Sequence, residues 1–311
     1  MEESLFDLCT KIYIADTPIS QSRYHSLISS AACDVGVSKM ASCSSTFQAR
    51  YPNGSDAAYD YVATPTIDIL LQHQSIRSFL PDPLPGGTLE TLIAAGQSAS
   101  TSSMLHSWSV IAIQDPSHKE DIAKLCGDQD FIRQAPLFLV FCADLHRMDH
   151  LCKRYGQTGE ALNNMDLFMQ STLDAALAAQ NVTIAAESLS LGICYVGAAR
   201  NNAQQMTQLL RVPHRSLILF GLAIGKAKPH DDAIKPRLPL NEVLHREYWS
   251  DDKMDENIAN YDDALGAFYW EHHKHGRRTW SDHTSRWVSR NELDGREEYR
   301  KVVTAQGFGL E

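Results

Sequence analysis

Two short basic segments, far apart in the chain, carry the side chains best suited to bind an anion. The first, residues 73–79, places His73, Ser75 and Arg77 at alternate positions. The second is Lys235-Pro236-Arg237-Leu238-Pro239, whose prolines hold two cations on a stiff extended segment. A guanidinium offers a fixed fork of donors that matches phosphate oxygens, and Ser and His add hydrogen bonds. We predict that the two segments form the two sides of one phosphate site.

These cations stand out because the chain as a whole is acidic. Its 311 residues carry a formal net charge of −10, and 43% are hydrophobic, as in an ordinary globular protein. A chain of this charge repels nucleic acid and anionic membranes, so neither is an expected partner. No apolar run approaches the roughly 20 residues of a membrane helix, and the start lacks the basic region of a signal peptide. We expect a cytoplasmic protein.

The seven cysteines support a reducing compartment, because they are odd in number and show no C-x-x-C spacing. We interpret Cys126, Cys142, Cys152 and Cys194 as small buried hydrophobic residues. His272, His273, His275 and His283 could suggest a metal, but they follow a helix end and lack nearby thiols or patterned carboxylates. We therefore predict no metal and keep a metal-dependent protein as the third hypothesis.

The first 62 residues differ from the rest of the chain. They are rich in Ser and lack sustained periodicity, apart from a possible short helix over 5–12. We predict that residues 1–62 form a poorly ordered extension or an arm packed on a main domain of residues 63–311. A second Met at position 40 precedes an acid-free, Ser-rich stretch that ends at Arg50, so organellar import from that internal start is an alternative.

Helical and strand patterns alternate along the main domain, which favours a sheet covered by helices. The patterns predict strands over 108–113, 137–143, 193–196 and 216–225. They predict helices over 64–71, 88–97, 117–127, 160–191 and 254–273, one helix capped at Asn201 or Asn202, and a helical tail beyond 279. Thr88 is the predicted cap of the second helix, a capping box at Ser117 begins the third, and Gly192 ends the fourth.

The longest predicted helix has an apolar side made of small residues. A neighbouring backbone or a flat ligand could therefore approach it closely. These small residues are Ala175, Ala176, Ala178, Ala179, Ala185 and Ala186.

Six local signatures occur in one order along the chain. They are residues 73–77, the serine loop 100–103 with Ser107-Trp108, residues 127–129, residues 195–202, residues 235–239 and residues 277–283. Because these signatures occur in this order, the chain resembles the FMN-dependent nitroreductase superfamily over residues 64–311. It is most similar to the branch of oxygen-insensitive NADPH nitroreductases and NADPH-flavin oxidoreductases.

The resemblance implies an α+β fold with a central, mostly antiparallel sheet flanked by helices, in a domain-intertwined homodimer that binds FMN at the subunit interface. It implies that His73 and Ser75 contact the FMN phosphate and ribityl, and that Lys235 and Arg237 close on the phosphate. Gln74 stands where the branch usually has a second basic residue. No side chain acts as a nucleophile; Arg77 polarises the flavin N1/O2 edge, where a fixed cation favours hydride uptake.

The same resemblance assigns the remaining site residues. Gln129 is expected at the flavin pyrimidine edge, and Thr101, Ser102 and Ser103 form a loop supplied by the other subunit. The flavin ring is expected to lie against Tyr195, Val196, Gly197 and Ala198. Ala198 replaces a common Gly, so it should fit only if its φ is negative. Arg277 and Arg278 fall where the branch recognises the 2′-phosphate of NADPH.

The implied function is an FMN-dependent NADPH oxidoreductase that works by ping-pong hydride transfer through FMN N5. The implied oxidants are nitroaromatics, quinones, chromate-like ions or free flavins. The alternative is a non-catalytic flavin-binding or partner-binding protein on the same fold, which the long N-terminal segment, Gln74 and Ala198 motivate.

Overall fold

A computed structural model describes residues 46–52, 62–229, 233–273 and 279–311 of the chain. The expectations for a helix over 5–12, for a start at Met40 and for Arg277 and Arg278 lie outside these residues. The chain divides into two compact units, residues 1–47 and 48–311. Only the last two residues of the first unit are described, so the account below concerns the second.

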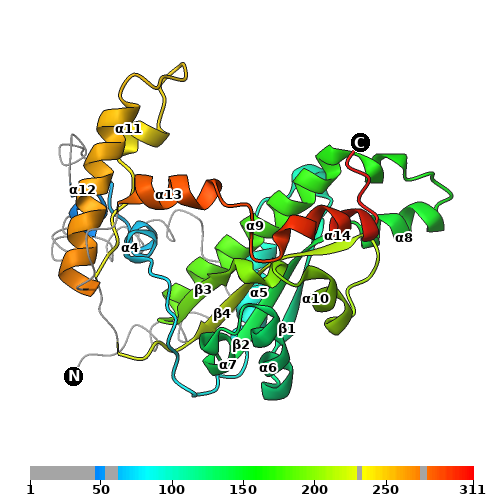
Figure 1. The fold of residues 1–311 in the computed structure, drawn as a ribbon. Coiled ribbons are helices and arrows are strands. Elements are labelled where there is room, and N and C mark those ends of the chain that lie inside the picture. The colour runs from blue at the N-terminus through cyan, green and yellow to red at the C-terminus, as the bar shows by residue number, and fades with distance from the viewer. Residues whose placement is uncertain (1–45, 53–61, 230–232, 274–278) are drawn as a thin grey trace, which may run out of the picture. The chain divides into compact units, whose positions relative to one another are not determined.

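The centre of the second unit is a four-stranded antiparallel sheet with the strand order β1-β2-β4-β3 (Figure 1). The strands are β1 Trp108–Ile113, β2 Leu137–Asp144, β3 Gly192–Val196 and β4 Ser216–Gly225. All eight residues of β2 are buried, as its continuous apolar run predicted. The predicted antiparallel sheet is confirmed, and each predicted strand agrees with the structure to within one residue.

Helices cover both faces of this sheet because alternate residues of β2 point to opposite sides. Leu137, Leu139 and Phe141 pack with residues of α5, Thr88–Gln97, and α9, Met165–Ser188. Phe138, Val140 and Cys142 pack with residues of α6, Pro116–Leu125, and α7, Asp130–Gln134. The fold is therefore α+β, as predicted.

Further helices complete the described chain. They are α4 Pro65–Gln72, α8 His146–Arg154, α10 Ala203–Leu209, α11 Leu240–Val243, α12 Met254–His273, α13 Trp280–Val288 and α14 Tyr299–Ala305. Single 3₁₀ turns occur at η2 Ser102–Met104, η3 Glu160–Asn163, η4 Gly197–Arg200 and η5 Arg296–Glu298. The predicted helix over 254–273 and the helical tail are confirmed. Within the described ranges, no helix combines the length and the apolar character needed to cross a membrane.

The longest helix is shorter than predicted at both ends. Residues 160–163 form the 3₁₀ turn η3, and α9 begins after Asn164, whose side chain accepts a hydrogen bond from the Asp166 N–H. At the other end Ser190 takes a left-handed conformation with φ of 59°, so the chain turns before Gly192. Gly192 is the first residue of β3 instead of a helix cap. The prediction of one helix to Gly192 was wrong because Asn164 and Ser190 already break it.

Two predicted helix caps were also displaced. Thr64 caps α4 as predicted, by accepting from the Ile67 N–H, but α5 follows a left-handed Gly87 and Thr88 is its first residue. The Asp115 carboxylate caps α6 by accepting from the His118 N–H at 2.8 Å. Asp before Pro116 therefore begins the helix two residues ahead of the predicted capping box at Ser117.

The small residues of α9 allow the close approach of another helix. A Cβ added to Gly96 of α5 would lie 2.9 Å from Cγ2 of Val182 and 3.4 Å from the Ala178 carbonyl oxygen. Ala178 is fully buried, whereas Ala176 is exposed and does not belong to this contact. Of the two predicted uses of this face, a neighbouring backbone is the one observed at Gly96.

Candidate functional site

The two basic segments line one cavity of about 410 Å³. The first segment contributes His73, Gln74, Ser75, Ile76, Arg77 and Ser78, and the second contributes Lys235 and Arg237. Arg50, Ala233, Phe268 and His272 complete the lining. Residues about 160 positions apart in the sequence therefore share one concave surface.

The first segment is held beside strand β3. Ser75 forms a parallel bridge with Ile193, and the Ile76 N–H donates to the Ile193 carbonyl at 2.8 Å. Ile76 is buried against Gly192, where an added Cβ would lie only 2.7 Å from Cγ1 of Ile76. Because side chains of an extended segment alternate, burial of Ile76 leaves Ser75 and Arg77 exposed. The apolar residue fixes the segment and the polar residues face outward.

His73 is oriented by an acidic residue of α9. Its Nδ1 lies 2.6 Å from Oε1 of Glu187, whose side chain is 13% exposed. A ligand in the cavity would therefore meet the other ring nitrogen, Nε2.

The second segment is fixed through its prolines. Pro236 and Pro239 are buried, and the Tyr261 hydroxyl donates to the Pro236 carbonyl at 3.4 Å. Lys235 is exposed, with its Nζ 3.0 Å from the Tyr269 hydroxyl and 5.0 Å from the centre of that ring. Buried prolines and exposed cations fit the predicted stiff segment that presents positive charge.

Arg50 is a residue of this cavity that the sequence analysis missed. It is only 4% exposed, and its guanidinium donates to the carbonyls of Leu71, His73 and Lys235. Burial and the nearby Arg237 charge lower the pKa of Arg50 to about 10. The only sequence signal was an Arg that ends an acid-free, Ser-rich stretch.

The described lining residues of the cavity carry an excess of positive charge. Arg50, Arg77, Lys235 and Arg237 all line it, and none of the described lining residues is Asp or Glu. This local charge opposes the net charge of −10 of the whole chain. Guanidinium and ammonium donors around one concave surface suit an anion such as a phosphate.

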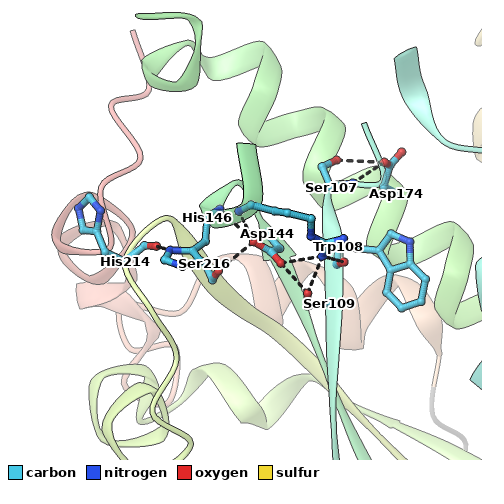
Figure 2. A network of polar contacts seen from close by, with 9 residues as sticks. Ser107, Trp108, Ser109, Asp144, His146, Asp174, His214 and Ser216 are labelled. Atoms are coloured by element: carbon cyan, nitrogen blue, oxygen red, sulfur yellow. Dashed lines mark hydrogen bonds and ion pairs between the residues drawn. The ribbon is translucent and has the colours of Figure 1, made fainter. Parts of the chain in front are cut away.

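The serine loop lies on a buried carboxylate, as Figure 2 shows for Ser107 and Asp174. Oδ2 of Asp174 accepts from the Thr101 hydroxyl at 2.6 Å and from the Ser107 hydroxyl at 3.0 Å, and Oδ1 accepts from the Ser102 N–H at 3.0 Å. Burial would raise the pKa of Asp174, but these hydrogen bonds outweigh it and hold that pKa below its usual value. Ser103 follows with φ of 51°. Thr101, Ser102 and Ser103 are not among the residues that line the cavity.

The remaining predicted site residues also lie outside the cavity lining. Gln129 precedes α7, and its side-chain amide donates to the Cys126 carbonyl at 2.6 Å. Tyr195 is the exposed residue of β3, and its hydroxyl accepts from the Thr183 hydroxyl at 3.1 Å. Val196 precedes the turn η4, which holds Gly197 and Ala198. Ala198 does not have a positive φ, so the condition set for its methyl group is met.

The described cysteines are mostly buried, and His272 lies at the cavity. Cys126, Cys142 and Cys194 are buried, as predicted, and burial raises the pKa of Cys126 and of Cys142 to about 12. Cys152 is half-buried. His272 lines the cavity, and over the part of the chain that the structure describes no three His, Cys, Asp or Glu residues form a group that could hold a metal ion.

A second carboxylate network lies at the opposite end of β2 from the cavity. Register places Leu137 beside Ile224 and Ile224 beside Ile193, whereas Asp144 pairs with Ser216. Figure 2 shows Asp144 between Ser109 and Ser216, which donate to it at 2.5 and 3.2 Å. Arg147 adds an ion pair at 3.0 Å. This network joins strands β1, β2 and β4.

Comparison with protein families assigns the chain to a known class of proteins. The family model described as "Nitroreductase family" matches residues 70–226, and the family model described as "Nitroreductase family, C-terminal domain" matches residues 235–311. The chain belongs to the nitroreductase family.

Curated relatives narrow this class. The chain is 41% identical over 222 residues to an FMN reductase (NADPH) of Bacillus subtilis, which covers 70% of this chain and 88% of the relative. It is 40% identical over 225 residues to an oxygen-insensitive NADPH nitroreductase of Salmonella typhimurium, covering 72% of this chain and 90% of that relative.

Solved structures of similar fold support the same family. The NfrA1 nitroreductase of B. subtilis superposes with a TM-score of 0.75 at 37% identity, covering 79% of this chain and 100% of that chain. An NADPH:FMN oxidoreductase of Vibrio harveyi, complexed with NAD⁺, superposes with a TM-score of 0.71 at 30% identity, covering 80% of this chain and 100% of that chain. The family predicted from the ordered signatures is confirmed.

Proposed function

We propose that the chain is an FMN-dependent NADPH oxidoreductase of the nitroreductase or flavin reductase type. The observation that carries this proposal is the cation-rich cavity, in a chain of the nitroreductase family whose relatives include an FMN reductase (NADPH). When bound, FMN supplies the redox chemistry, by accepting a hydride from NADPH and passing electrons to an oxidant.

The residues of the cavity fit a phosphate ester. Lys235 and Arg237 present cations from one side, and Ser75 and His73 present short-range hydrogen-bonding groups from the other. Arg77 is exposed on the same segment, two residues beyond Ser75. We assign Arg77 to the flavin N1/O2 edge, where a fixed guanidinium stabilises the negative charge that reduction creates.

We propose that the protein acts as a homodimer. Met165, Met169, Leu173 and Leu177 recur every fourth residue of α9 and are 42%, 50%, 58% and 48% exposed. Such a stripe of exposed apolar side chains is typical of a contact surface. Asp174 holds the serine loop beside this stripe, so a partner packed on α9 would meet Thr101, Ser102 and Ser103. Light scattering measures the molar mass of wild type and of a Leu173→Lys variant. We expect a dimer for wild type and a monomer for the variant.

The names of the relatives support the proposed electron donor and oxidants. We assign Arg277 and Arg278 to the 2′-phosphate of NADPH, so their Ala variants should raise the KM for NADPH more than the KM for NADH. Equal changes for both nucleotides would remove this assignment. Nitroaromatics, quinones and flavins are the proposed oxidants, because the named activities of the relatives are nitroreductase and FMN reductase. We place the protein in the cytoplasm.

The experiment that tests the proposal has two parts. FMN is titrated into the purified protein and followed by quenching of flavin fluorescence, and NADPH oxidation is then measured with a quinone as acceptor. Saturable binding and turnover support the oxidoreductase. Binding without turnover would favour the alternative, a non-catalytic flavin-binding protein, and the absence of binding would contradict both.

A further inference from the structure

Arg50 belongs to the cavity although it precedes both matched family regions, which begin at residues 70 and 235. It lies within the second compact unit, and residues 48–50 are helical. Its side chain is directed inward, since it is only 4% exposed. A fully charged side chain is buried in this way only where the fold gives it several partners.

The guanidinium joins the two sides of the cavity. Nε donates to the Leu71 carbonyl at 2.8 Å and Nη2 donates to the His73 carbonyl, both at the C-terminal end of α4. Nη1 donates to the Lys235 carbonyl at 2.8 Å. Carbonyls at a helix C-terminus lack partners within the helix, so a cation there is favourable. One rigid fork therefore sets the distance between the segment of His73 and the segment of Lys235.

The backbone of Arg50 makes a second tie to the same segment. Its carbonyl accepts from the Arg237 N–H at 2.9 Å. Lys235 and Arg237, the two cations of the proline-rich segment, thus each have a backbone group bound to Arg50. A change at Arg50 would loosen the backbone that carries both.

The electrostatics of Arg50 indicate an anionic ligand. Burial and the neighbouring Arg237 charge lower its pKa and so disfavour its cationic form, and Tyr51 and Glu187 only partly offset them. The described lining residues supply no carboxylate to balance Arg50, Arg77, Lys235 and Arg237. A phosphate in the cavity would supply the missing negative charge.

We infer that Arg50 is a positioning residue for the phosphate group of the flavin, and that the segment before the matched family regions is part of the cofactor site. This inference rests on the proposed function. Arg50 holds the backbone of His73, Lys235 and Arg237 in the arrangement that binds the phosphate, and it adds a positive charge beside it.

Binding of FMN and of riboflavin tests the inference, because the two flavins differ only in the phosphate. Dissociation constants are measured by fluorescence quenching for wild type, Arg50→Met, Arg50→Lys and Arg300→Met in the full chain. Arg300 is exposed on α14 and is the matched control. Arg50→Met should weaken FMN binding roughly 10- to 100-fold and change riboflavin binding less than about twofold. Arg50→Lys should be intermediate, and Arg300→Met should match wild type.

Three outcomes would overturn parts of this account, and they are distinct. Equal FMN affinity of Arg50→Met and wild type would overturn the inference and leave the proposed function intact. Equal losses for FMN and riboflavin would show a general structural role and would also overturn it. A wild-type protein that binds no FMN would overturn the proposed function and the inference together. If Arg50→Met does not fold by circular dichroism, Arg50→Lys carries the same comparison, with a loss expected for FMN alone.

Discussion

The two ends of the central sheet lie next to polar groups of opposite character. At the end where Ser75 bridges Ile193 of β3, the cavity gathers Arg50, Arg77, Lys235 and Arg237 without a carboxylate among its described lining residues. At the other end, Asp144 accepts from Ser109 and Ser216 and pairs with Arg147. The carboxylate is satisfied within the chain, whereas the described residues that line the cavity carry more cations than anions. A polar cluster that satisfies itself stabilises the fold, and a cluster with unbalanced charge is suited to a ligand.

The pKa shifts follow the same division. Burial would raise the pKa of Asp144, but hydrogen bonds from Ser109 and Arg147 outweigh it, so the ionised form is favoured. Burial and Arg237 lower the pKa of Arg50, so its charged form is disfavoured by its surroundings. The first group is stabilised by the protein alone, and the second would be stabilised by an anion.

The largest effect is expected at the carboxylate end. Asp144→Ala should reduce the free energy of unfolding by about 2–4 kcal/mol, because it leaves the buried Ser216 hydroxyl and the His146 N–H without their acceptor. Urea denaturation measures this change. Asp149→Ala, which removes a surface pair with Lys153, is the control and should cost less than about 1 kcal/mol. An Asp144→Ala protein as stable as this control would contradict the structural role of the network.

The next largest effect is expected at the cavity, on the rate of flavin reduction instead of on the stability of the fold. Arg77→Ala should slow reduction of bound flavin by NADPH roughly 100-fold, because it removes the cation that stabilises the charge formed on reduction. Its urea midpoint should stay close to that of wild type, since Arg77 is exposed. Reduction at the wild-type rate would disprove the assignment of Arg77 to the flavin N1/O2 edge.

A smaller effect is expected where the cavity meets α9. Glu187→Ala should weaken FMN binding roughly tenfold, because the His73 ring loses the contact at 2.6 Å that orients it. Glu187→Gln keeps an acceptor of the same shape and should lose less. Fluorescence titration measures both, and an Ala variant that binds FMN as tightly as the Gln variant would show that orientation of His73 does not matter.

The smallest effect is the acid dependence of stability. Asp144 and Asp174 both have folded-state pKa values below the usual value, which is about 3.9 in an unfolded chain. Their contribution is therefore complete above that value and is lost as the pH falls through the folded-state pKa. Urea midpoints between pH 3 and 6 should fall on the acid side in wild type and fall less in Asp144→Asn. Parallel curves would contradict the pKa shift of Asp144.

The sequence predicted well those features that depend on neighbouring residues. The continuous apolar run of β2 and the alternation in β1 are local patterns, and both strands lie where they were expected. The cap of α6 was misplaced because Asp115 before Pro116 competes with Ser117, which local rules alone do not rank. The two basic segments were expected to meet because both carry phosphate-binding residue types, and they line one cavity.

Arg50 could not be predicted because its partners are backbone carbonyls. The Lys235 carbonyl lies 185 residues away in sequence, and a carbonyl group is present at every residue, so no pattern of residue types marks the contact. The same holds for Glu187 and His73, whose pairing depends on where α9 ends relative to the first segment. Such contacts follow from the tertiary structure alone.

The most direct test of the central claim, that the cation-rich cavity holds a flavin reduced by NADPH, is anaerobic stopped-flow. The FMN-reconstituted protein is mixed with NADPH, and separately with NADH, while the absorbance of oxidised flavin is followed. Rapid loss of that absorbance with NADPH, and slower loss with NADH, is the predicted result. Tight FMN binding with no loss for either nucleotide would contradict the account and identify a flavin-binding protein without reductase activity.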